Sequence, residues 1–142
     1  MRGLGVAGWT KWLGWGCWAW AVTAQAGNVA QLQCVFDLNG ERSTQVFGLS
    51  ADPYRTPSVN LADRFRFKAV LVGQGTAVER VDLYVSQLTE RQPMILQHAH
   101  YARPTVLPHA QDHSLTGQVA VYAAWLGKEL RYGCSLYEVP GP

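Results

Sequence analysis

"QLQCVFDLNG", residues 31–40, is the stretch of this sequence that decides the fold. As far as Leu38, its even-numbered residues are apolar and its odd-numbered residues are mostly polar. This period of two is typical of a β-strand that places one face in a hydrophobic core. The dipeptide Asn39-Gly40 follows directly and favours a tight hairpin turn. The sequence therefore predicts a strand, a two-residue turn and a second strand within residues 41–49.

Alternating apolar and polar residues recur along the rest of the chain. The clearest case is "DRFRFKAVLVG", in which Phe65, Phe67 and the two following odd-numbered residues face one way. Residues 117–126 are apolar on both faces, which predicts a central strand. The strands predicted beyond the hairpin lie within residues 63–73, 78–86, 94–102, 117–126 and 129–139.

About seven strands, with no helix of ten residues, predict an antiparallel β-sandwich that is immunoglobulin-like or similar. A small β-barrel is the alternative. Residues 50–62 and 103–115 lack periodicity and are predicted to be long connections, where binding sites often lie.

The first 26 residues have the pattern of a secretory signal peptide. A basic start is followed by the apolar run of residues 13–22 and by Ala24 and Ala26, which fit a small-residue cleavage site. An uncleaved anchor is the alternative, but a span needs about 20 apolar residues. We therefore expect a periplasmic or secreted protein. Residues 27–142 would form its single domain, with no stable membrane span after cleavage.

The cysteines predict one disulfide. Cys17 belongs to the predicted signal peptide, which leaves Cys34 and Cys134, each on the apolar face of its strand. An even number of cysteines in an exported chain favours pairing, here between the first and last strands. Two buried free thiols are the alternative. The bond would also remove both cysteines as nucleophiles.

Charge argues against a nucleic-acid partner. The chain has 12 Lys and Arg and 10 Asp and Glu, for a formal net charge of +2. Two of those bases, Arg2 and Lys11, lie in the predicted signal peptide, so residues 27–142 are formally neutral. A neutral domain lacks the electrostatic footprint that binds nucleic acid or an anionic membrane.

All of the histidines lie between residues 97 and 113, which raises the possibility of a metal site. Alternate residues of a strand share a face, and Met94 is expected on the same face as the first two histidines. Imidazole suits zinc or copper. The opposing interpretation is a set of solvated side chains, because Pro104 and Pro108 interrupt the segment and no HExxH motif is present. The candidate metal ligands are His98, His100, His109 and His113.

The function expected from these patterns is a non-enzymatic accessory or binding domain that contacts another exported protein. No GxSxG or P-loop motif occurs in the chain and no GxGxxG motif occurs within residues 27–142, and no cofactor is predicted. Three tyrosines that fall outside the expected core, Tyr54, Tyr84 and Tyr122, are candidates for a recognition surface. The alternative for them is packing against arginine stems. A periplasmic zinc- or copper-binding protein using the histidines is the alternative function.

Overall fold

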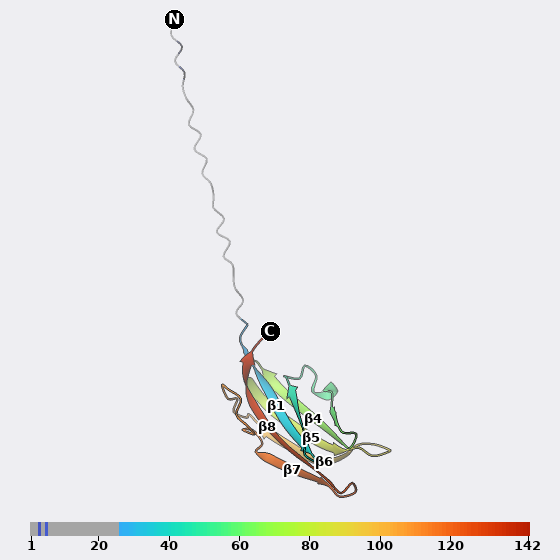
Figure 1. Ribbon diagram of the computed structural model, residues 1–142. Coiled ribbons are helices and arrows are strands. Elements are labelled where there is room, and N and C mark those ends of the chain that lie inside the picture. Colours follow the sequence, from blue (N-terminus) through green and yellow to red (C-terminus); the bar gives the residue numbers. More distant parts are fainter. Residues whose placement is uncertain (1–2, 4, 6–25) are drawn as a thin grey trace.

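β-Strands form nearly all of the regular structure in this computed structural model, which describes Gly3, Gly5 and residues 26–142 (Figure 1). The remaining regular element is a short 3-10 helix, η1 (Pro53–Arg55). The strands are β1 (Asn28–Leu38), β2 (Glu41–Phe47), β3 (Val59–Leu61), β4 (Phe65–Gln74), β5 (Ala77–Gln87), β6 (Met94–Ala102), β7 (Gln118–Ala123) and β8 (Lys128–Pro140).

The strands form two antiparallel sheets that pack face to face as a sandwich (Figure 1). Sheet A has the order β2-β1-β8-β7, and sheet B has the order β3-β4-β5-β6. The predicted sandwich is confirmed. The barrel alternative is wrong, because within the described residues the strands divide into two separate sheets. The strand that sequence reasoning missed is β3, whose three residues are too few to show a period.

The position predicted for residues 117–126 is wrong, because β7 lies at an edge of sheet A and pairs with β8 alone. Val121 and Ala123 face the core, whereas Tyr122 is 62% exposed. The apolar residues that made the outer face look buried are the exposed Ala120 and Tyr122 of β7 and, in the β7–β8 turn, Trp125, which is 86% exposed. The apolar run therefore combined both faces of an edge strand with an exposed turn.

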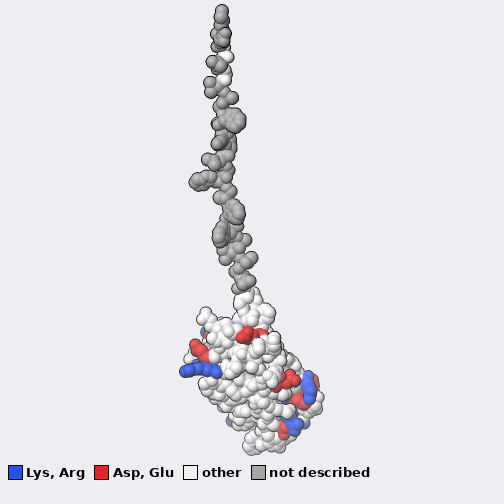
Figure 2. All heavy atoms as spheres, turned by 90° about the vertical axis from the view of Figure 1, so that its left-hand side faces the viewer, with Lys and Arg blue, Asp and Glu red and all other residues white. Residues whose placement is uncertain are grey.

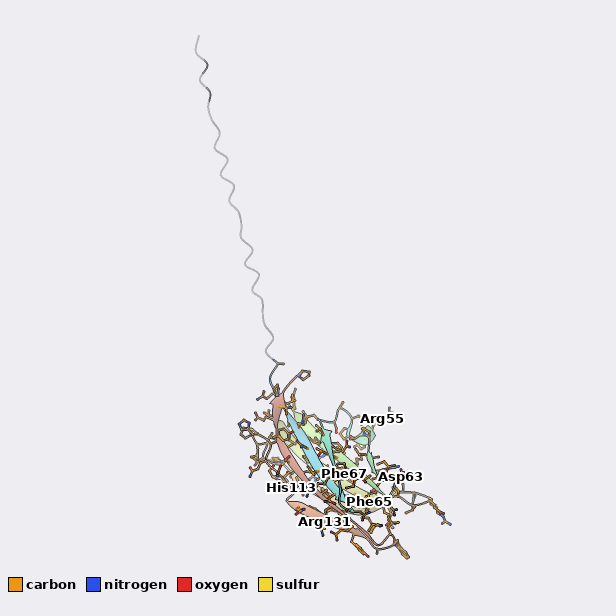
Figure 3. All side chains as sticks on the ribbon, in the orientation of Figure 1. Arg55, Asp63, Phe65, Phe67, His113 and Arg131 are labelled. Carbon is orange, nitrogen blue, oxygen red and sulfur yellow. A yellow bond between two sulfur atoms is a disulfide. The ribbon has the colours of Figure 1, made fainter. Side chains whose placement is uncertain are left out.

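The core is built from the alternate residues of β1, β4, β5 and β8, as the period of two predicted. Asn39 and Gly40 both have positive φ, at 57° and 85°, so the predicted β1–β2 turn is confirmed. At the centre of the core, the ring of Phe67 lies 4.7 Å from that of Phe36 and 5.3 Å from that of Tyr132, measured between centroids. Figure 3 labels Phe65 and Phe67 on β4, and both are fully buried between the sheets.

The predicted disulfide is confirmed. Cys34 of β1 and Cys134 of β8 are cross-strand partners within sheet A, with Cα atoms 4.1 Å apart, and both are buried. The bond joins the first and last strands, and it indicates an oxidising, non-cytoplasmic compartment. The predicted signal peptide and Cys17 lie outside the described residues, apart from Gly3, Gly5 and Ala26.

No helix in the described part of the chain is long and apolar enough to cross a membrane.

Tyr132 links the two sheets by a hydrogen bond. Its hydroxyl donates to Gln97 Oε1 of β6 at 2.7 Å. Burial is the main cause that raises the pKa of Tyr132 to about 12, and electrostatic repulsion by Tyr101 is the second. We expect Tyr132→Phe to lower the free energy of unfolding by about 1 kcal/mol, because it leaves the Gln97 oxygen without its donor. Urea denaturation measures this change. The exposed Tyr54→Phe is the control, and equal effects of both variants would contradict the prediction.

Candidate functional site

The outer face of sheet B carries a cluster of charged, aromatic and imidazole side chains. Because side chains alternate along a strand, every second residue of β4, β5 and β6 points away from the core. The strand register aligns these outward residues in rows across the sheet. Three consecutive rows are Arg66, Ser86 and Ile95; Lys68, Tyr84 and His98; and Val70, Asp82 and His100.

A groove of about 630 Å³ lies on this face. Its floor is formed by outward residues of β4 and β5, and one wall is the connection between β2 and β3, in which η1 contacts β4. The side chain of Asp52 caps η1 by accepting a hydrogen bond from the backbone N–H of Tyr54 at 3.0 Å. This cap fixes the start of η1, so Tyr54 lies at the groove rim with its side chain in solvent. The lining includes Tyr54, Arg66, Lys68, Val70, Arg80, Asp82, Tyr84 and Ile95.

A second hollow, of about 540 Å³, lies on the other side of the same connection, along β2. Its charged lining residues are Asp52 and Arg55, which lie 3.8 Å apart as an exposed ion pair. Their charges cancel, and the rest of the lining is mainly small or apolar. We therefore take the groove of sheet B as the candidate site.

Asp82 is the centre of a charged cluster at the edge of the groove. His98 Nε2 lies 3.1 Å and His100 Nδ1 2.7 Å from its Oδ1, and Arg80 Nε lies 3.2 Å from its Oδ2. Because an ionised carboxylate only accepts hydrogen bonds, each imidazole donates through the nitrogen named. Burial raises the pKa of Asp82, but the hydrogen bonds from His100 and His98 and the charge of Arg80 outweigh it and leave the pKa below its ordinary value of 3.8.

We expect Asp82→Asn to lower the free energy of unfolding by about 1 to 3 kcal/mol near neutral pH, because Arg80 then faces an amide. A lowered folded-state pKa stabilises the fold above the ordinary pKa, and this contribution is lost as the pH falls through the lowered value. The difference between wild type and variant should therefore shrink below about pH 4. Thermal unfolding across pH measures it. Exposed Asp112→Asn is the control, and a pH-independent difference would contradict the prediction.

The structure brings two of the four predicted metal ligands together and separates the others. His98 and His100 share the outer face of sheet B, as predicted, and both bind Asp82. His109 lies exposed in the connection that crosses to sheet A. His113 has a φ of +54° and packs against Gly133 of β8, where its ring fills the space that a Cβ would need (Figure 3). The four imidazoles therefore do not converge, because the connection carries His113 to the opposite face of the sandwich.

Met94 does not join His98 and His100 either. The register of β5 and β6 shifts by one residue, so that Val85 pairs with Gln97 but Ser86 pairs with Ile95. A bulge of this kind changes which residues face outward. Ile95, rather than Met94, therefore shares the groove face with the histidines.

Within residues 26–142, no group of three or more His, Cys, Asp and Glu side chains has an arrangement that would hold a metal ion. Asp82 and its two imidazoles, His98 and His100, resemble a set of metal ligands most. The second oxygen of Asp82 is paired with Arg80, which a bound cation would have to displace.

Two of the three predicted recognition tyrosines meet at the groove. Tyr54 is 93% exposed at the rim. Tyr84 lies on the floor and stacks on His98, with ring centroids 4.4 Å apart and planes 5° from parallel. Tyr122 lies on β7 of the other sheet. Sequence reasoning did not single out Arg66 and Lys68 as site residues, because charged residues that alternate with a buried strand face are usually only exposed to solvent. No sequence signal shows that residues 53–58 fold over that face.

In comparisons with known proteins, no family model, no curated protein and no solved structure matches this chain.

Proposed function

We propose that this chain is a non-enzymatic binding domain that works outside the cytoplasm, in the periplasm or as a secreted protein, and contacts another exported protein. The observation that supports this function is the groove of sheet B. Two tyrosines converge there with two basic side chains that form no ion pair within the described residues, from a strand floor and a capped connection. Tyr and Arg are enriched where proteins recognise one another.

The chemistry of the groove favours binding over catalysis. Both oxygens of Asp82 are engaged, and its hydrogen-bonded histidines act on that carboxylate. Ser58 and Ser86 line the groove, but neither forms a hydrogen bond with a histidine in the described chain. A nucleophile needs such a base within reach. The exported location is supported by the disulfide and by the predicted signal peptide.

Site-specific photo-crosslinking in the producing cells tests this function. A photoreactive amino acid in place of Tyr54 should give one discrete adduct with a second exported protein. The matched control is the same probe in place of Tyr122, which is also exposed but lies on sheet A. Adducts of equal yield from both positions, or from neither, would overturn the proposal.

A further inference from the structure

The charges that line the groove do not balance, and this imbalance points to the class of its ligand. Three basic residues line it, Arg66, Lys68 and Arg80, against one acidic residue, Asp82. Arg80 and Asp82 pair with each other at 3.2 Å. Within the described part of the chain, neither Arg66 nor Lys68 takes part in an ion pair. The groove therefore holds two unneutralised positive charges, although residues 27–142 are formally neutral.

The spacing of these two charges matches an extended peptide. Arg66 and Lys68 are alternate residues of β4, so their side chains leave the same face about 6.5 to 7 Å apart along the strand. Alternate side chains of an extended ligand recur at the same rise. Two acidic residues separated by one position would therefore each meet one cation. The guanidinium of Arg66 is suited to a bidentate pair with a carboxylate.

The uncharged lining residues of the groove suit the peptide residues that are not acidic. Ile95 is 62% exposed and adds an apolar side chain in the same row as Arg66, whereas Val70 is nearly buried in the floor, at 4% exposed. Tyr54 supplies an exposed aromatic ring at the rim. Aromatic side chains of this kind contribute large contact areas at low entropic cost. The groove thus offers an apolar and an aromatic contact beside the two charges.

The small number of free positive charges in the groove favours a short acidic segment over a polyanion as the ligand. Nucleic-acid binders commonly contact about 6 to 10 phosphates, and two free cations fall well below that. Figure 2 shows one side of the molecule, on which acidic and basic side chains lie in small mixed groups separated by uncharged surface. That side carries no broad basic surface.

We propose that the groove of sheet B binds an extended acidic peptide segment of the partner, with carboxylates on alternate residues paired to Arg66 and Lys68. This inference rests on the proposed function and names the ligand chemistry of that same groove. The partner segment lies along β4, because that strand carries both cations.

Fluorescence anisotropy with three labelled peptides and the oxidised, full-length protein tests this inference. One peptide carries two glutamates at alternate positions, its isomer carries them adjacent, and the third has glutamines instead. We expect the alternate peptide to bind about tenfold more tightly than the glutamine peptide, through two exposed ion pairs. The adjacent isomer should be weaker than the alternate one, because neighbouring side chains of an extended chain point to opposite sides.

Reversing the charges of Arg66 and Lys68 distinguishes a loss of peptide recognition from a loss of folding. Arg66→Glu/Lys68→Glu should lose the preference for the acidic peptide and gain a preference for one with alternate lysines. The matched control is Arg103→Glu/Lys128→Glu, which changes the net charge equally outside the groove and should keep the original preference. The gain of lysine-peptide binding requires a folded variant, so it excludes unfolding as the cause of the loss.

Three results would overturn the inference: equal binding of the glutamate and glutamine peptides, an unchanged preference in the groove variant, or displacement of the peptide by a sulfated polysaccharide that binds more tightly as its length grows. The last result would identify a polysaccharide as the ligand. Crosslinking from Tyr54 tests the proposed function separately. Specific adducts without a charge preference would leave that function standing and remove only the acidic ligand.

Discussion

A double variant, Cys34→Ala with Cys134→Ala, is expected to lose about 3 to 5 kcal/mol of the free energy of unfolding. The bond joins residues 100 positions apart. For a closed loop of about 100 residues, the chain-entropy model gives a stabilisation of about 4.7 kcal/mol, because the cross-link restricts the unfolded chain. Domains of ordinary stability unfold at a net cost of about 5 to 15 kcal/mol. The variant should therefore be marginally folded.

Urea denaturation of the oxidised protein, the reduced protein and the double alanine variant measures this loss. The reduced wild type is the matched control, since it has the same sequence without the cross-link. Because both sulfur-bearing residues are fully buried, we also expect a reductant to act slowly until urea opens the fold. Equal midpoints for all three forms would show that pairing within sheet A already holds β1 against β8 without the bond.

Phe67→Ala should produce the second large loss, about 3 to 5 kcal/mol, through the transfer and cavity costs of a buried aromatic ring. Phe67 is fully buried at the centre of the sandwich, and its ring contacts those of Phe36 and Tyr132 from the opposite sheet and that of Phe47, at centroid distances of 4.7, 5.3 and 5.7 Å. Its loss would remove contacts between the two sheets.

Chemical denaturation compares this variant with Phe67→Leu and Val46→Ala. The leucine fills part of the cavity, so it should cost less than the alanine. Val46 is 54% exposed on β2, and its replacement should change the free energy of unfolding by no more than about 0.5 kcal/mol. A loss from Phe67→Ala no larger than that from Val46→Ala would mean that the core does not depend on the aromatic cluster.

The candidate site could be predicted only in part. The sequence placed His98 and His100 on one face, and the structure confirms this, because two residues on a strand share a face whatever surrounds them. It did not predict their common partner Asp82, which comes from the neighbouring strand and depends on the register. The bulge that turns Ile95 outward also arises from pairing and leaves no local pattern.

By itself, the sequence determined the inward faces of the long strands, the Asn39-Gly40 turn and the Cys34–Cys134 pairing. Each follows from a local rule: the two-residue period of a strand, the backbone preferences of two turn residues, and the count of cysteines in a chain expected to be exported. The tertiary structure alone decided that β7 is an edge strand, that the connection carries His113 to the far side of the sandwich, and that η1 folds beside β4 to form the groove. These features depend on contacts between segments distant along the chain, for which a local period carries no information.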